Sequence, residues 1–99
     1  MRPVRLRRAA KLELNEAAEW YRERDPEVAS RFLREVFRAI TLVERFPLTG
    51  GPVFGVDDPD IRQLPVNNFP YHVVFKRFAE RLVVLAIAHD RRKPGYWRR

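Results

Sequence analysis

The residues of this chain best suited to chemistry are its two histidines, His72 and His89, and the stretch AHDRRKPGYWRR at residues 88–99. A histidine can give or take a proton near neutral pH, and cationic side chains bind phosphate and carboxylate groups. Pro94 and Gly95 predict a turn. That turn leaves Tyr96 and Trp97 either folded back on the protein or exposed as stacking platforms for bases or a target protein.

The histidines lie on two segments that are expected to form a β-hairpin, 71–78 and 82–89, around a turn at residues 79–80. A symmetric turn pairs Val73 with Ala86 and Phe75 with Val84. The same side of the hairpin also carries Tyr71, Leu82 and Ala88, so this side is wholly apolar and is expected to pack against helices.

The opposite side of this hairpin is where both histidines are expected. The symmetric register places His72 opposite Ile87 and makes His89 its diagonal neighbour, at about 7–8 Å. Lys76 shares that side. A single bulge in either strand would reverse this arrangement, because it moves every later side chain to the other face.

The net charge of +7 is concentrated at the two ends of the chain. Residues 1–9 carry four arginines and no acid, and residues 88–99 carry five cations and one aspartate. Cations and anions nearly balance in residues 10–87. This asymmetry suggests a polyanionic partner, either nucleic acid or an acidic protein segment. The alternative is that both ends are solvated and only keep the protein soluble.

The hydrophobic pattern predicts a single domain over residues 1–99 with an α+β fold. We expect a short strand at 4–7, then two amphipathic helices that meet at Asp25 and Pro26 and form an antiparallel hairpin. Residues 46–60 are expected to form a loop, and a strand at 61–66 precedes the β-hairpin. The result is an N-terminal strand, a helical hairpin and a three-stranded antiparallel meander, with both helices on one face of one small sheet.

Several classes of protein do not fit this composition. The chain has no cysteine, which suits a reducing compartment, and its longest apolar run, 82–88, is far too short to span a bilayer. We therefore expect a cytoplasmic protein with no membrane partner. Two histidines without nearby thiols or carboxylates make a metal site improbable. No glycine-rich phosphate loop, dinucleotide motif or Ser-His-Asp pattern is present, so no cofactor is expected.

The last thirty residues of the chain resemble part of a known protein family. NNFPYHVVFKRF and LVVLAIAHDRRKPGYW, together with the helical pair AAEWYRERDPEVASRFLREV and Arg62, resemble the RelE/ParE toxins of type II toxin–antitoxin systems. These are often labelled plasmid stabilisation proteins. The resemblance covers nearly the whole chain. It implies a ribonuclease-like sheet in which the first strand runs beside the last, so that Arg7 and Arg8 come near His89 and Arg91.

The resemblance leaves two mechanisms open. RelE-like members cut messenger RNA on the ribosome by attack of a ribose 2′-OH on the next phosphate, which needs a base, an acid and cationic stabilisation. The chain has a histidine, His72, where RelE-like toxins often have arginine. A set that could serve a ribonuclease consists of His72, His89, Arg62 and Arg91.

ParE-like members instead inhibit growth by poisoning DNA gyrase and hydrolyse nothing. The FPY opening at residues 69–71 and the AxxHxRR ending are closer to this branch, which we expect for this chain. The basic residues then form a target-binding surface, made of Arg91, Arg92, Lys93, Tyr96, Trp97, Arg7 and Arg8.

The resemblance also implies a protein partner. A cognate antitoxin usually folds an extended or helical segment over such a toxin, which makes a hetero-oligomer. Apolar residues of the two helices that could form its groove are Trp20, Leu33 and Phe37, unless these side chains only pack in the core. A third alternative is a module that binds nucleic acid or an antitoxin and has lost its toxicity.

Overall fold

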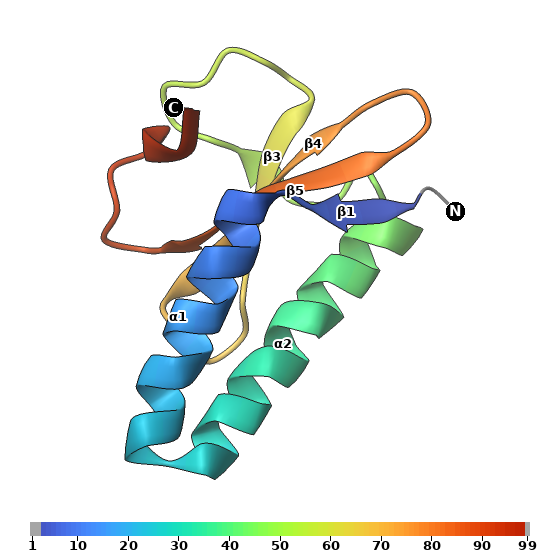
Figure 1. Cartoon of the computed structure of the whole chain (residues 1–99). Coiled ribbons are helices and arrows are strands. Elements are labelled where there is room, and N and C mark those ends of the chain that lie inside the picture. The colour runs from blue at the N-terminus through green and yellow to red at the C-terminus, as the bar shows by residue number, and fades with distance from the viewer. Residues whose placement is uncertain (1–2, 99) are drawn as a thin grey trace.

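The computed structural model describes residues 3–98, in which two helices cover one face of a five-stranded sheet (Figure 1). The charges expected on Arg2 and Arg99 lie outside this part of the chain. The strands are β1 (Val4–Leu6), β2 (Gly51–Pro52), β3 (Ile61–Pro65), β4 (Tyr71–Arg77) and β5 (Leu82–His89). Their order across the sheet is β1-β5-β4-β3-β2. Within residues 3–98, no helix is both long and apolar enough to cross a membrane.

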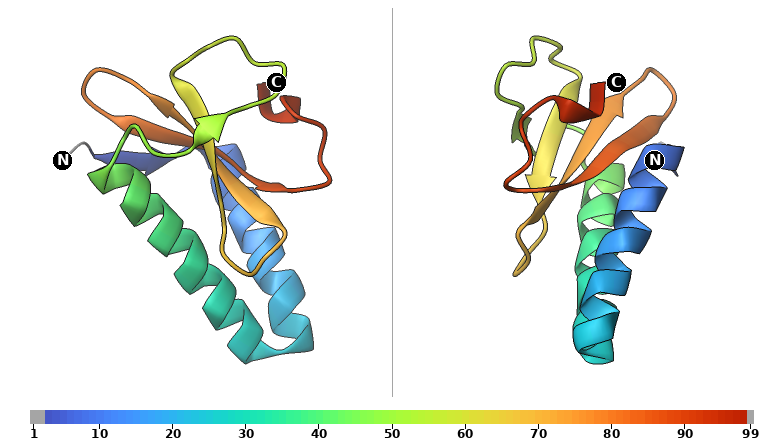
Figure 2. Two further views of the ribbon diagram at one scale, coloured as in Figure 1. Left: turned by 180° about the vertical axis from the view of Figure 1, so that it is seen from behind. Right: turned by 60° about the vertical axis from the view of Figure 1, so that its left-hand side comes forward.

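The helical hairpin forms as the sequence predicts. Helix α1 (Arg8–Arg24) and helix α2 (Pro26–Arg45) are separated by Asp25 alone. The Asp25 carboxylate accepts a hydrogen bond from the Glu27 backbone N–H at 3.0 Å, and Pro26 occupies the first turn of α2. A proline there costs nothing, because that N–H has no partner within the helix. Both helices therefore run side by side against the sheet (Figure 2).

The main core lies between these helices and the sheet. The fully buried Phe32 and Val36 of α2 pack in one cluster with Val73 of β4 and Val84 of β5. Burying each such side chain contributes about 1.5–3 kcal/mol. The helical residues in this cluster lie on one face of each amphipathic helix: Ala10, Leu14, Ala17, Ala18, Phe32, Val36, Ala39 and Ile40.

The sheet is mixed and has five strands, which corrects the prediction of a purely antiparallel meander beside one N-terminal strand. The meander β3-β4-β5 is present, and β1 pairs with β5 in parallel, with Leu6 opposite Val84. The added strand is β2, which lies in the segment expected to be a loop and pairs Gly51 with Gln63. A glycine followed by a proline gives no strand signal, so this pairing was not predictable from local propensity.

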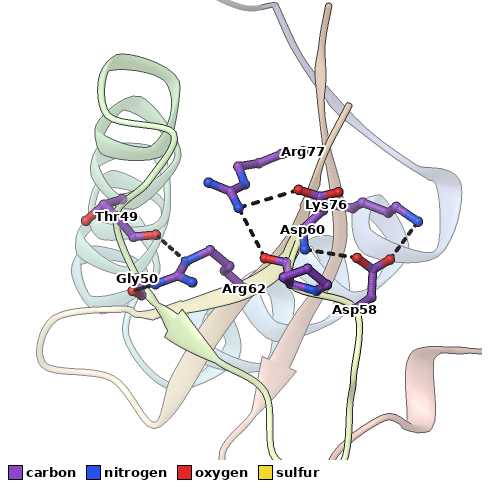
Figure 3. A network of polar contacts seen from close by, with 8 residues as sticks. Thr49, Gly50, Asp58, Asp60, Arg62, Lys76 and Arg77 are labelled. Atoms are coloured by element: carbon purple, nitrogen blue, oxygen red, sulfur yellow. Dashed lines mark hydrogen bonds and ion pairs between the residues drawn. The ribbon is translucent and has the colours of Figure 1, made fainter. Parts of the chain in front are cut away.

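The rest of the segment between α2 and β3 is held by cationic side chains (Figure 3). Arg62 donates to the backbone carbonyls of Thr49 and Gly50, and Arg77 donates to that of Pro59 at 3.1 Å. Lys76 lies 2.9 Å from the Asp58 carboxylate. This hydrogen bond holds the pKa of Asp58 below its usual range. The segment is therefore a fixed connection packed on the sheet.

The hairpin β4-β5 contains a β-bulge that the sequence did not indicate. Phe75 pairs with Val84 as predicted, but Val74 pairs with Ala86, so Leu85 is an extra residue in β5. The pairing register of β4 and β5 therefore shifts by one residue across the bulge. The predicted pairing of Val73 with Ala86 is wrong, because Val73 pairs with Ile87.

The bulge also changes which residues face the helices. Ala86 and Ala88 were expected on the helix side, but both pack with Val74 and Trp97 on the opposite side of the sheet. Ile87 takes their place in the helix-side core. Strand β5 is thus covered on both faces, which suits its continuous apolar run.

Candidate functional site

The C-terminal segment folds back onto the sheet face opposite the helices. After β5 the chain turns through residues 90–95, where Gly95 has a φ of 84°, and ends in a short 3-10 helix, η1 (Tyr96–Arg98). Trp97 is 6% exposed and packs against Val74, Ala86 and Ala88. Of the two arrangements left open for Trp97, the structure therefore has the folded one, which leaves its ring little surface for stacking on a target.

Hydrogen bonds join this segment to the start of the chain. Arg7 donates through Nε to the Leu85 carbonyl at 2.7 Å and through Nη2 to the Trp97 carbonyl. The prediction that the first strand lies beside the last is confirmed, although Arg7 reaches the bulge and the 3-10 helix instead of His89. Arg8 is exposed at the start of α1 and forms no hydrogen bond or ion pair with residues 88–98 through its side chain.

A carboxylate on α1 completes the attachment. Glu13 accepts a hydrogen bond from the Tyr96 hydroxyl and another from the Ile87 backbone N–H, at 3.1 Å in the second case. This N–H lies beyond the end of β1, where no strand can pair with it. Partial burial raises the pKa of Tyr96, and the hydrogen bond to Glu13 raises this pKa further. No sequence signal indicates this role of Glu13, because Glu13 is one of several acidic residues along α1.

The two histidines lie on opposite faces of the sheet, so the prediction of a shared face is wrong. His89 pairs with Tyr71, whose ring packs in the helix-side core at 5.0 Å from the imidazole. His72 pairs with Ala88 and lies on the other face. The bulge at Leu85 is the physical reason, because it reverses the alternation of β5 relative to β4.

His72 forms a hydrogen-bonding contact with Asp90 that joins β4 to the start of the tail. Its Nδ1 lies 3.0 Å from Oδ1 of Asp90, at the edge of a cleft of about 350 Å³. Arg92, Lys93 and the exposed Phe54 also line this cleft. The imidazole is oriented by a carboxylate beside two cations, which suits binding of an anionic group. Asp90 follows β5 directly and contacts His72 of the neighbouring strand β4.

The other residues of the predicted ribonuclease set are placed elsewhere. Arg62 lies two residues before Leu64 in β3, so it shares the helix side of the sheet with Leu64. The Arg62 guanidinium donates hydrogen bonds to the carbonyls of Thr49 and Gly50. His89 lines a second hollow, of about 460 Å³, against α1. Its Nδ1 accepts the Arg91 backbone N–H at 3.1 Å. The four residues therefore do not meet in one site.

The cations of the tail differ in how they are held. Arg91 and Lys93 are exposed, and Arg92 lies over the Tyr96 ring at 3.8 Å from its centroid. Arg98 donates to the Gly55 carbonyl at 2.6 Å. Residues 91–93 are thus presented to solvent by a segment that is fixed on both sides. Within residues 3–98, no group of three His, Asp or Glu side chains is placed to hold a metal ion.

Comparison with known proteins gives the family of this chain. A family model described as the ParE toxin of the type II toxin–antitoxin system parDE matches residues 4–94. The chain belongs to this family of ParE toxins. A comparison with curated proteins finds no match.

A solved structure described as "Chromosomal ParDE TA system from P. aeruginosa" has the same fold as this ParE-family chain. The TM-score is 0.75 and the sequence identity is 18%, over 90% of this chain and 96% of that chain. An identity this low shows the fold alone.

The apolar helix residues proposed to meet an antitoxin are only partly available in this ParE-family chain. Trp20 and Phe37 are each 51% exposed. Leu33 is partly buried and packs against the helix-side core, as the alternative of ordinary core packing allowed. The guanidinium of Arg24 lies 3.5 Å from the centroid of the Trp20 ring, which covers part of that side chain.

Proposed function

We propose that this chain is a growth-inhibiting toxin that acts on DNA gyrase and is neutralised by a cognate antitoxin. Membership of the ParE toxin family, by a match over residues 4–94, is the observation that carries this proposal. Gyrase works on DNA in the cytoplasm, where the toxin would meet it. The hetero-oligomer with the antitoxin belongs to the same proposal, with Trp20 and Phe37 as its exposed apolar contacts.

The target-binding surface in this proposal is the segment 91–93 with its supports. Arg91 and Lys93 are exposed, and Arg92 is held over Tyr96. Tyr96 anchors this segment through its hydrogen bond to Glu13, and Trp97 anchors it by packing against the sheet. Arg7 donates a hydrogen bond to the Trp97 carbonyl. Three neighbouring cations on a fixed backbone favour contact with an acidic protein surface or with DNA phosphates.

The separation of the candidate catalytic residues also supports a non-hydrolytic mechanism. Cleavage of RNA needs a base, an acid and cationic donors within reach of one phosphate. His89 and Arg62 lie on the face opposite His72, and the Arg62 guanidinium is bonded to two backbone carbonyls. If His72 acted as the base, the acid and the cationic donors would have to come from Arg92 and Lys93, which line the same cleft.

The contact between His72 and Asp90 favours a second candidate function, RelE-like cleavage of messenger RNA. A carboxylate that orients an imidazole is the usual arrangement for a general base. The two cations at the same cleft could stabilise charge on a phosphate. Arg91, as the nearest further cation in sequence, would be the remaining member of this set.

Induced expression in a bacterial host tests the two candidates against each other. Messenger RNA integrity is followed by primer extension within minutes of growth arrest. Intact transcripts in arrested cells would support the gyrase mechanism, and cleaved transcripts would support the ribonuclease. No arrest at all would leave a binding module without toxicity.

A matched pair of variants adds a residue-level test. His72→Ala removes the imidazole from the cleft, and Asn67→Ala changes an exposed turn residue as a control. The gyrase proposal expects both variants to arrest growth as the wild type does. Loss of toxicity in His72→Ala alone would favour the ribonuclease.

A further inference from the structure

The Phe54 side chain stands exposed at the cleft beside His72, which we call the His72 cleft. It is 86% exposed, the largest fraction among the exposed large apolar side chains of residues 3–98. An exposed ring by itself is common on protein surfaces, so the groups around it decide its role. Here the ring lines the cleft together with His72, Arg92 and Lys93. An aromatic surface and two cations therefore share one concave site.

The backbone on both sides of Phe54 is fixed. Val53 is 4% exposed and packs in the core cluster on the tail side of the sheet. Its carbonyl accepts the backbone N–H of Val56 at 3.1 Å, and the Gly55 carbonyl accepts Nη2 of Arg98 at 2.6 Å. Figures 1 and 2 show this loop beside the C-terminal 3-10 helix. The ring is thus presented by an ordered backbone, which lowers the entropic cost of binding.

The cations of the His72 cleft are available to a ligand. Arg92 and Lys93 are exposed, and within residues 3–98 no carboxylate lies at ion-pair distance from either. The one carboxylate that lines the cleft, on Asp90, contacts His72 at 3.0 Å instead. Arginine and lysine side chains are the usual partners of phosphate groups. The lining therefore offers a phosphate two cations that no acid neutralises.

We propose that the His72 cleft binds single-stranded nucleic acid, with one base stacked on Phe54 and the adjoining phosphate on Arg92 and Lys93. Every base has a flat aromatic face, so stacking on Phe54 needs no particular sequence. In a duplex the bases stack on one another, and one of them reaches Phe54 only after unpairing. The contacts involve base and phosphate alone, so DNA and RNA strands bind alike.

This proposal concerns the cleft of the second candidate function, but it requires no cleavage and does not rest on gyrase as the target. Tyr96 and Trp97 were the stacking platforms considered from the sequence. Trp97 is buried, and the Tyr96 hydroxyl is hydrogen-bonded to Glu13. The stacking role therefore falls to Phe54, in a segment that the sequence marks only as a loop.

Fluorescence anisotropy with labelled oligonucleotides tests the proposal on the full chain. The probes are a short oligodeoxyuridine, the matched oligouridine, and the duplex that the oligodeoxyuridine forms with its complement. We expect the two single strands to bind with the same affinity and the duplex to bind more weakly. The duplex carries more negative charge per unit length, so binding by charge alone would favour the duplex instead.

Two exposed phenylalanines provide a matched pair of variants. Phe54→Leu keeps an apolar side chain and removes the ring, so single strands should bind about fivefold more weakly or worse, as expected for the loss of one stacked base. Phe46→Leu makes the same change at a ring that is 60% exposed and does not line the cleft. This control should bind as the wild type does, and Phe54→Trp should bind at least as tightly.

The phosphate contact is tested by salt dependence. Lys93→Gln should reduce the slope of log affinity against log salt by about 0.7, the value for one phosphate contact on a single strand. Arg81→Gln is the control, because Arg81 is exposed and does not line the cleft. Its slope should equal that of the wild type.

Several results would overturn the proposal. They are the absence of single-strand binding, equal or tighter binding of the duplex, binding of oligouridine alone, or equal affinities of Phe54→Leu and Phe46→Leu. Displacement of the oligodeoxyuridine by an equal concentration of a capped oligoglutamate peptide would show an acidic protein segment as the occupant, and would overturn it as well. Gyrase is absent from these measurements, so a failure here leaves the gyrase proposal standing.

Discussion

The Tyr96 hydroxyl donates a hydrogen bond to Glu13, a residue 83 positions earlier in the chain, and this bond ties the C-terminal segment to helix α1. The same carboxylate accepts the Ile87 N–H, so one side chain joins α1, β5 and the tail. The cations at 91–93 are presented by this arrangement. The contribution of this arrangement to the free energy of unfolding can be measured separately from any activity.

Tyr96→Phe should lower the free energy of unfolding by about 1–2 kcal/mol, because it removes a partly buried hydrogen bond to a charged group. For a domain of this size that corresponds to a fall in Tm of about 4–15 °C. Thermal unfolding followed by circular dichroism checks it. Glu13→Gln keeps an acceptor for the Ile87 N–H and should cost less than Glu13→Ala. Equal losses in the two Glu13 variants would contradict a hydrogen-bonding role.

Stability should fall at alkaline pH through Tyr96. Burial and the Glu13 carboxylate raise the pKa of Tyr96 in the folded protein above its ordinary value of 10.0. The resulting stabilisation is therefore fully present below pH 10 and is lost as the pH rises beyond it, because the unfolded chain ionises first. Denaturant titrations across this range should give a shallower decline for Tyr96→Phe. A residual decline is expected, because burial also raises the pKa values of Tyr21 and Tyr71. An unchanged slope in the variant would refute the assignment.

The two tryptophans should differ sharply in their contribution to stability. Trp97→Ala empties a site where the ring is 6% exposed, and should lower the free energy of unfolding by about 3–5 kcal/mol. Trp20→Ala removes a half-exposed ring and its contact with Arg24, and should cost less than about 1.5 kcal/mol. Urea unfolding compares the variants. Fluorescence offers a second check, since emission from Trp97 should lie at shorter wavelength than emission from Trp20. Equal costs would mean that the tail does not form part of the core.

Gly50 and Gly51 provide a matched pair for the strand that the sequence did not predict. An added Cβ at Gly50 would lie 2.5 Å from the Gln63 carbonyl oxygen, and the residue has a φ of 85°. Gly50→Ala should therefore lower the free energy of unfolding by more than about 2 kcal/mol. Gly51 has nothing within 4 Å of the same position, so Gly51→Ala should change stability by less than about 1 kcal/mol. Similar effects of both changes in urea unfolding would argue against the pairing of β2 with β3.

Much of the fold was predictable, because strong local signals agree with the tertiary structure. Asp25 and Pro26 mark the link between the helices, and the apolar spacing of α2 gives its buried face. The bulge at Leu85 was not predictable, since LVVLAIAH is apolar throughout and fits either register. The predictions that depended on the register beyond the bulge failed with it, including the pairing of Val73 with Ala86 and the shared face of His72 and His89. The site prediction was therefore less accurate than the fold prediction.

The tail was predictable in composition but not in position. Its cations and aromatic residues are evident in the sequence, but the burial of Trp97 depends on Ala86 and Ala88 facing away from the helices. That orientation again follows from the bulge. The contact of Glu13 with Tyr96 joins residues too distant in sequence for any local pattern to reveal.

The supercoiling activity of purified DNA gyrase tests the central claim most directly. The wild-type chain and the Arg91→Ala variant are each added to gyrase, relaxed plasmid and ATP. We predict that the wild type inhibits supercoiling and that Arg91→Ala, which removes an exposed cation of the tail, inhibits at least tenfold less. Full supercoiling in the presence of a wild-type chain that arrests growth in cells would contradict the proposal, and would direct attention to the His72 cleft.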